Sequence, residues 1–344
     1  MKSFFPSLIG NEPLLAQLGK EILSDRLGHA YILEGPAGTG KHTLAMQIAA
    51  ALACERREDP DAALPCLQCP ACRKILSGNS PDVIIKGRDD KSTIGVDPIR
   101  EMRTAAFMAP NELENKIFII EDAQDMTAQA QNALLLILEE PPAYLRFLLL
   151  TDGSIPLLET VRSRAPTLRL SGLSRNLLQA RLLETEPEAR ILQLQAPEEF
   201  REVIAAASGS LGLAKKLLDP KARQAVLEDR KTARTFAELA ASHASASSVI
   251  PFLNGFGSQR ESVIARLSTM LLCVRDLSLL KQSEDAPLCF FYDRENATAL
   301  AYRFTAPELM RYSREISAAM DALYRNANVR LTLTRFAMHA GLLP

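Results

Sequence analysis

A glycine-rich stretch near the N-terminus has the residues needed to hold a phosphate. It reads GPAGTGKHT and covers residues 35–43. Glycines let the backbone fold around an anion so that N–H groups and a helix N-terminus point at it, and Lys41 would reach the terminal phosphates. The stretch therefore predicts a nucleotide-binding loop made of Gly35, Pro36, Ala37, Gly38, Thr39, Gly40, Lys41, His42 and Thr43. The alternative is an ordinary tight turn before a helix.

The residue after the lysine argues against a well-held magnesium ion. A serine or threonine normally stands there and gives a hydroxyl oxygen to Mg²⁺, a hard ion that prefers oxygen ligands. This chain has His42, which offers nitrogen. Thr43 cannot replace it, because the next residue along a helix lies about 100° round the axis. We expect ATP or ADP to bind weakly and Mg²⁺ to be held poorly.

An acidic pair follows the apolar run IFII at 117–120. In nucleotide-hydrolysing sites an Asp that holds the Mg²⁺ shell normally precedes a Glu that orients the attacking water. Here the order is Glu121 then Asp122, so each carboxylate has the wrong length by one methylene. A misplacement of about 1 Å can cost roughly a hundredfold in rate. These two acids and Thr151 complete the predicted nucleotide site, but hydrolysis by this chain alone is not expected. The alternative is that the pair begins a solvated turn.

Four of the six cysteines are clustered in the pattern C-x11-C-x2-C-x2-C. Such a cluster in a reducing compartment indicates metal binding, and four thiolates suit a closed tetrahedral Zn²⁺ site with a structural role. The predicted ligands are Cys54, Cys66, Cys69 and Cys72. Free thiols or a disulfide are the alternative. Cys273 and Cys289 lie far downstream and are expected to be buried apolar residues.

Short apolar strands must position these residues. AYILEG at 30–35 leads into the glycine loop, and further buried strands are predicted at 82–86, 116–122 and 146–152. Helical patterns alternate with them, as in KHTLAMQIAAAL after the loop and in AQAQNALLLILEE at 128–140, which two prolines stop. This alternation is typical of a parallel sheet covered by helices.

The pattern changes at about residue 171, after which the strands disappear. About four short helices, separated by Pro187, Pro197 and Gly209, are followed by longer helices from about residue 221. The predicted fold class is therefore α/β followed by all-α. A length of 344 residues agrees with two or three domains. We place them at 1–170, with the cysteine insertion at 54–72, at 171–220 and at 221–344.

Composition limits the function classes. Lys plus Arg number 40 against 41 for Asp plus Glu, so no long-range field holds this chain on nucleic acid, and any DNA contact is expected to be a local patch. No run of eighteen apolar residues occurs, and the start lacks the pattern of a cleaved leader. We expect a soluble cytoplasmic protein with no membrane partner.

Several of these stretches together resemble one family. The chain is similar to the AAA+ clamp-loader subunits of bacterial DNA polymerase III, most closely those of the delta-prime class. Besides the cysteine cluster, the resemblance rests on GHAYILEGPAGTGK (28–41), SPDVI (80–84), KIFIIEDAQDMTAQAQNALLLILEEPP (116–142), SRA (163–165) and NANVRLTLTRFAMH (326–339). It implies an AAA+ P-loop domain, a small helical lid at 171–220 and a helical collar at 221–344 that builds the oligomer.

The resemblance also implies a catalytic arginine that acts on another subunit. The family's Ser-Arg-Cys motif supplies an arginine finger in trans, and this chain has Ser163, Arg164 and Ala165. A planar, permanently charged guanidinium stabilises a transferring phosphoryl group. Motor subunits of the family also carry G-S-x-R-x-A-L, whereas here Gly212 replaces the sensor arginine. The alternative for Arg164 is a surface arginine in an exposed loop.

Together these features imply a delta-prime-like stator in a hetero-pentamer with gamma/tau and delta subunits. Such a complex, part of the DNA polymerase III holoenzyme, would open a sliding clamp and place it on primer-template DNA. One alternative is an ATP-hydrolysing gamma/tau-type motor subunit, for which Lys41 is the best evidence. His42, Gly212 and the expected absence of a long C-terminal extension argue against it. Another is a P-loop phosphotransferase such as a nucleoside kinase, which explains neither the cysteines nor the helical end.

Overall fold

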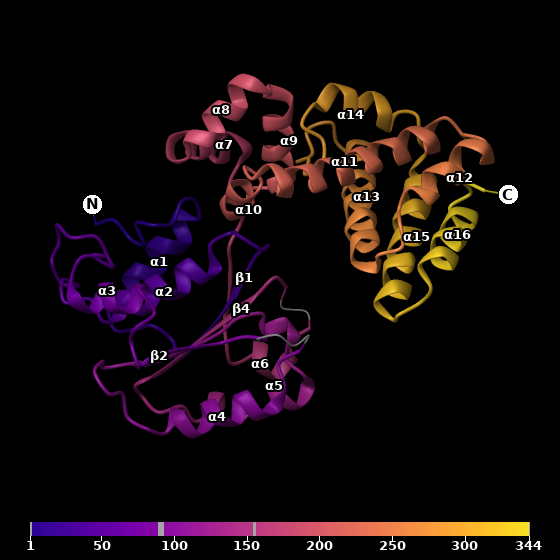
Figure 1. The fold of residues 1–344 in the computed structure, drawn as a ribbon. Coiled ribbons are helices and arrows are strands. Elements are labelled where there is room, and N and C mark those ends of the chain that lie inside the picture. Colours follow the sequence, from indigo (N-terminus) through magenta and orange to yellow (C-terminus); the bar gives the residue numbers. More distant parts are fainter. Residues whose placement is uncertain (1, 89–92, 154–155, 344) are drawn as a thin grey trace. The chain divides into compact units, whose positions relative to one another are not determined.

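The chain folds as two compact units. The computed structural model describes residues 2–88, 93–153 and 156–343 (Figure 1). One unit contains residues 1–174 together with 209–212, and the other contains 175–208 together with 213–344. The predicted change from α/β to all-α is confirmed, because the last strand ends at Arg169. The division of the helical part into a lid and a collar stays a prediction, and the end residues 1 and 344 of the predicted domains lie outside the described residues.

The first unit is built on a five-stranded parallel sheet with the order β2-β3-β4-β1-β5. Its strands are β1 (Ala30–Glu34), β2 (Val83–Lys86), β3 (Lys116–Ile120), β4 (Leu145–Thr151) and β5 (Thr167–Arg169). All four predicted strands are present, but the one predicted at 116–122 ends at Ile120, so Glu121 and Asp122 lie in the turn that follows it. The fifth has only three residues and gives no periodic pattern, so the sequence did not indicate it.

Helices cover both faces of this sheet (Figure 1). Alternate strand residues point to opposite faces, so Tyr31 and Leu33 face one apolar core while Ala30 and Ile32 face the other. The first core includes α1 (Glu12–Leu23), α2 (Lys41–Leu52) and α3 (Pro70–Leu76). The second includes α4 (Val96–Ala106), α5 (Ala128–Glu139) and the short α6 (Glu159–Arg162). A single 3-10 turn, η1 (Ala123–Asp125), follows β3.

Local sequence explains where the two predicted helices begin and end. α2 starts immediately after Gly40, whose φ of 95° favours glycine, and residues 44–52 of α2 are all buried. The side chain of Thr127 caps α5 by accepting a hydrogen bond from the N–H of Ala130 at 3.2 Å. Pro141 and Pro142 then prevent its continuation.

The second unit is helical. Its helices are α7 (Arg175–Thr185), α8 (Pro187–Gln195), α9 (Pro197–Ala207), α11 (Pro220–Ala241), α12 (Ala246–Asn254), α13 (Arg260–Leu280), α14 (Arg294–Ala301), α15 (Ala306–Tyr324) and α16 (Val329–His339), and α10 (Leu211–Lys216) straddles the boundary. α13 is central and packs against α11, α14 and α15. Within the described ranges, no helix is both long and apolar enough to cross a bilayer.

Charged side chains, two of them buried, tie one loop of this unit to three of its helices. The carboxylate of Asp276 on α13 accepts backbone hydrogen bonds from Cys289, Phe290 and Phe291. Arg175 on α7 donates to the carbonyl oxygens of Leu288, Phe291 and Tyr292, and Arg230 on α11 donates to that of Phe290. The loop at 288–292 therefore joins the short helices to the longer ones within a single unit.

Asp82 organises the turn before β2 in the SPDVI stretch. Its side chain is fully buried, and its carboxylate accepts backbone hydrogen bonds from Asn111, Glu112 and Leu113 at 2.7, 2.7 and 2.9 Å. Burial alone would raise the pKa of Asp82, but these three donors and the nearby Lys116 outweigh burial and hold that pKa below its usual value.

Asp82→Ala is expected to lower the free energy of unfolding by about 3 kcal/mol, because it removes a buried carboxylate and leaves three backbone N–H groups without their acceptor. A depressed folded-state pKa stabilises the fold above the unfolded-state pKa, and that stabilisation is lost as pH falls through the folded-state pKa. The cost of the substitution should therefore shrink in acid. Urea unfolding at neutral and acidic pH measures it. The control Asp97→Ala removes an exposed acid on α4 and should cost less than about 0.5 kcal/mol, so equal costs for the two variants would contradict this role.

Candidate functional site

The glycine loop lies between β1 and α2, at the carboxyl edge of the sheet where ligands bind in folds of this class. The N–H of Gly35 donates to the carbonyl oxygen of Thr151 at 3.1 Å, which ties the loop to the end of β4. A Cβ at Gly35 would lie 2.6 Å from the carbonyl oxygen of Leu170. Only glycine fits this close approach, so the loop geometry is imposed by the sheet.

Lys41 begins α2, and its ammonium group is held by its own chain. Nζ lies 2.6 Å from Oδ1 of Asp152 and 3.1 Å from the carbonyl oxygen of Pro36, and it also donates to the carbonyl oxygen of Gly35. Only 12% of the Lys41 side chain is exposed, against 55% for Asp152. The residue predicted to reach a phosphate is thus paired with a carboxylate that the sequence did not single out.

His42 and Glu121, both predicted site residues, meet directly. Nδ1 of His42 lies 2.6 Å from Oε1 of Glu121, and both side chains are partly exposed. A Ser or Thr at position 42 and an acid at the end of β3 are the groups that would share a magnesium ion. In this chain the two positions contact each other as imidazole and carboxylate.

Asp122 also has a cationic partner, Arg88. Nε of Arg88 lies 3.0 Å from Oδ2 of Asp122, and its NH1 lies 3.3 Å from Oδ2 of Asp125. The backbone of Asp122 is left-handed, with φ of 50°, which begins the η1 turn directly after β3. Burial raises the pKa of Asp125, Arg88 lowers it, and the negative charges of Asp122 and Asp152 raise it further. Arg88 and Asp125 belong to no recognisable sequence motif, so the sequence did not predict them as site residues.

The remaining residues of the predicted nucleotide site differ in their contacts and exposure. The Thr39 hydroxyl donates to the carbonyl oxygen of Pro36 at 2.8 Å. Thr151 is buried, and its hydroxyl donates to the carbonyl oxygen of Gly153 at 2.6 Å rather than extending toward the loop. Four further residues of the predicted loop are exposed to solvent: Pro36, Ala37, Gly38 and Thr43.

Gly212 lies against the phosphate loop. It is the last residue of the segment 209–212, which belongs to the first unit. A Cβ at Gly212 would lie 3.6 Å from both the Cα and the carbonyl oxygen of Gly38. A side chain at this position would begin in van der Waals contact with the loop, and glycine provides none.

Arg164 lies two residues after the end of α6. One guanidinium nitrogen donates to Oε1 of Glu139 at 2.8 Å and another donates to the carbonyl oxygen of Thr160 at 3.2 Å. Its side chain remains 36% exposed. The neighbouring Ala165 is fully buried, so the departure from the Ser-Arg-Cys motif falls on a small packed position. Glu139, in the LEEPP stretch, positions an arginine that still faces solvent.

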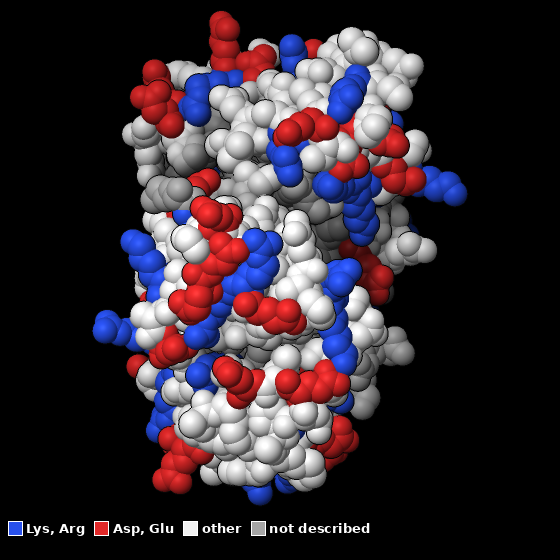
Figure 2. Space-filling model, turned by 90° about the vertical axis from the view of Figure 1, so that its left-hand side faces the viewer, with Lys and Arg blue, Asp and Glu red and all other residues white. Residues whose placement is uncertain are grey.

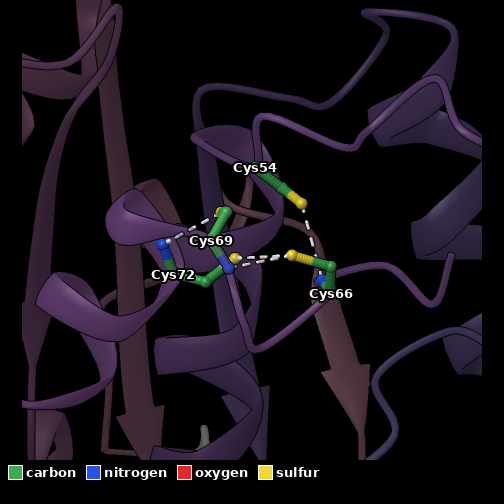
Figure 3. Close-up of side chains that lie close together, drawn as sticks. All are labelled: Cys54, Cys66, Cys69 and Cys72. Atoms are coloured by element: carbon green, nitrogen blue, oxygen red, sulfur yellow. Dashed lines mark hydrogen bonds between the residues drawn. The ribbon is translucent and has the colours of Figure 1, made fainter.

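The four clustered cysteines converge, as Figure 3 shows. Their sulfur atoms all lie within 4.8 Å of one another, and all four residues are buried. Sγ of Cys66 and Sγ of Cys72 are 3.9 Å apart. Tetrahedral zinc with Zn–S bonds of about 2.3 Å requires sulfurs roughly 3.8 Å apart, which the Cys66–Cys72 pair matches, so the four cysteines form a donor set that could hold Zn²⁺. Cys54 belongs to the cluster despite the eleven-residue gap that precedes Cys66.

Backbone N–H groups donate hydrogen bonds to sulfurs of this cluster, which favours their thiolate form. The N–H of Cys69 lies 3.4 Å from Sγ of Cys66, and the N–H of Cys72 lies 3.4 Å from Sγ of Cys69. Burial raises the pKa of Cys66, but hydrogen bonds from Gln68, Cys69 and Cys54 outweigh it and lower this pKa to about 7. Burial raises the pKa of Cys54 and of Cys72. None of the six cysteines takes part in a disulfide in the structure.

Charged side chains of both signs are exposed on the face of the molecule drawn in Figure 2. On the face drawn in Figure 2, blue and red side chains are interspersed rather than separated by sign. This agrees with the net charge of -1. A broad basic surface of the kind that binds nucleic acid without help is not evident on that face.

Comparison with known proteins finds similarity to subunits of DNA polymerase III. Residues 10–174 match the family described as DNA polymerase III, delta subunit. DNA polymerase III subunit tau of Bacillus subtilis is 34% identical over 216 residues, which are 62% of this chain and 37% of that protein. DNA polymerase III subunit delta′ of the same organism is 35% identical over 179 residues, 52% of this chain and 53% of that protein. The solved structure of a DNA polymerase III gamma subunit-related protein of Thermotoga maritima aligns with 94% of this chain and covers 98% of its own chain. The sequence identity is 16% and the TM-score is 0.43.

These comparisons confirm the resemblance to the AAA+ clamp-loader subunits of DNA polymerase III, and subunits of the tau and delta-prime classes are both among the relatives. The chain spans 37% and 53% of the lengths of the two curated relatives. Their identities of 34% and 35% are too similar to choose between the classes, so that choice depends on the site residues.

Proposed function

From this resemblance we propose that the chain is a delta-prime-like stator subunit of a DNA polymerase III clamp loader. It helps to load the sliding clamp on primed DNA and supplies Arg164 in trans to the ATP site of a neighbouring subunit. Its partners are gamma/tau and delta subunits in a hetero-pentamer, and it meets the clamp and primer-template DNA through that complex. The helices at 171–220 form its lid, and those at 221–344 form its collar.

One observation carries this proposal: each of the side chains that would drive hydrolysis in this chain is paired with another side chain of the chain. Lys41 is paired with Asp152, His42 with Glu121, and Asp122 with Arg88. A catalytic site needs these groups directed at nucleotide, magnesium and water. Gly212 adds to this, because the position that contacts the loop has no side chain that could sense a phosphate.

Arg164 differs from these groups in being held yet exposed. Glu139 and the carbonyl oxygen of Thr160 orient its guanidinium, and the side chain stays accessible from outside the unit. An arginine finger must be positioned by its own subunit and still reach another subunit's phosphates. These contacts support a role in trans.

The proposal includes a structural zinc ion and a weakly bound nucleotide. Cys54, Cys66, Cys69 and Cys72 hold a structural Zn²⁺, for which the buried sulfur cluster provides a fitting donor set. The glycine loop binds ATP or ADP weakly through its backbone and Lys41, with little help from Mg²⁺, because His42 offers no hydroxyl oxygen.

The purified chain is expected to hydrolyse ATP no faster than its Lys41→Ala variant, and His42→Ser is expected to restore no turnover. A hydroxyl at position 42 repairs only one of the departures and leaves Glu121, Asp122 and Gly212 unchanged. Steady-state phosphate release in Mg²⁺ measures this. Thr43→Ser, an exposed hydroxyl exchange one residue along α2, serves as the matched control. Turnover by His42→Ser clearly above this control would contradict the proposal.

A second candidate function is an ATP-hydrolysing motor subunit of the gamma/tau type. It is favoured by the retained Lys41 and by the tau relative, which aligns with 62% of this chain against 52% for the delta-prime relative. Turnover by the purified wild-type chain that Lys41→Ala abolishes would support this function instead of the stator.

A further inference from the structure

The hydrogen-bonding capacity of Lys41 is fully used within the chain. A lysine ammonium has three N–H donors and no acceptor. Nζ of Lys41 has three partners: the carbonyl oxygens of Gly35 and Pro36 and the carboxylate of Asp152. A phosphate can therefore bind Lys41 only by displacing one of them.

Of the three partners, Asp152 is the one whose side chain can leave. The two carbonyls belong to the loop itself, and Pro36 is further held by the N–H of Thr39 at 3.3 Å and by the Thr39 hydroxyl at 2.8 Å. Asp152 is more than half exposed and contacts Lys41 only through its terminal carboxylate. Its backbone position is nevertheless fixed, because the preceding Thr151 accepts the hydrogen bond from Gly35 that joins β4 to the loop.

The charge of Asp152 also matters to an incoming anion. Asp122 and Asp152 both lie near enough to Asp125 for their negative charges to raise the pKa of Asp125. Asp122 and Asp125 share Arg88, whereas Asp152 is the carboxylate of this group that neutralises Lys41. A carboxylate and a phosphate present the same kind of oxygen to the ammonium, so the two compete for one position.

We propose that Asp152 is an autoinhibitory residue of the phosphate loop: its carboxylate occupies the position of a terminal phosphate on Lys41 and so keeps the affinity for polyphosphate anions low. The inference rests on the part of the proposed function that gives the loop weak nucleotide binding. It names the ligand class as the polyphosphate group, independent of the base. When a triphosphate binds, the Asp152 side chain turns into solvent and Lys41 keeps its loop contacts.

The test compares the affinity of the full purified chain for ATP and for inorganic tripolyphosphate, measured by titration calorimetry with EDTA present. Asp152→Asn keeps the shape of the side chain and removes its charge. Loss of a partly exposed ion pair of up to about 1 kcal/mol corresponds to roughly fivefold tighter binding, and we expect that gain for both ligands. Adding Lys41→Ala to Asp152→Asn should remove the gain.

Asp125→Asn is the matched control, because it removes one negative charge from the same group without touching Lys41. An affinity for Asp152→Asn that equals wild type or is weaker overturns the inference, as does the absence of measurable binding by both proteins. An equal gain in Asp125→Asn also overturns it, since the effect would then be general charge repulsion. Failure of the stator role is distinguishable, because that role is measured by ATP turnover of the assembled complex.

Discussion

Arg164→Ala is expected to slow ATP hydrolysis at the neighbouring subunit's site by about a thousandfold, because an arginine finger is worth roughly 10³–10⁵ in kcat. The guanidinium acts on charge that develops in the transition state, so kcat should fall while KM for ATP stays nearly constant. Arg164→Lys should recover little, since an ammonium lacks the planar fork. The measurement is DNA-stimulated turnover by the complex reconstituted with gamma/tau and delta subunits, together with the number of ATP molecules hydrolysed in a single round.

Arg162→Ala is the matched control for this experiment. Arg162 is an exposed arginine at the end of α6, two residues before Arg164. It should leave turnover unchanged and so exclude a general effect of removing positive charge from this surface. Assembly must be verified for both variants by gel filtration. Arg164→Ala complexes that assemble and hydrolyse ATP at the wild-type rate would refute the role in trans.

Local patterns predicted most of the fold. α2 follows from a glycine that accepts positive φ and from a run of small and apolar residues, and α5 follows from a threonine cap and two terminating prolines. These signals lie within one element, so they are visible in the sequence. β5 could not be predicted in the same way, because three residues carry no period and the strand exists through its pairing with β1.

The sequence predicts which residues form the candidate site, but it does not predict which of their side chains contact one another. The glycine loop, the acids after β3 and the arginine after α6 are local patterns. That Lys41 contacts Asp152 depends on β4 lying beside β1, and these residues are 111 positions apart in the chain. The contact between Gly212 and the loop has the same origin. Such pairings decide whether the groups are available for catalysis, and only the three-dimensional arrangement contains them.

Chelation of zinc, or Cys72→Ser, is expected to destabilise the first unit severely, by about 4 kcal/mol or more, which is typical of the loss of a structural metal. Cys72 is fully buried at α3, and the cysteines belong to the same apolar core as α1 and α2. Without a metal, four buried thiols would remain beside this core with few partners. The purified chain should contain about one zinc per molecule by elemental analysis, and it should lose the metal as pH falls because protons compete for the thiolates.

Cys289→Ser is the control for this prediction, because it removes a partly exposed thiol in the second unit and should change neither zinc content nor unfolding temperature. Cys54→Ser tests the ligand that follows least obviously from spacing. If Cys54 completes the tetrahedron, its loss should release zinc to a chromogenic chelator far faster than in wild type, since three ligands leave an open position. A chain that refolds to full stability in a chelator, or a Cys72→Ser variant that keeps its zinc, would show that the cluster is only a set of packed thiols.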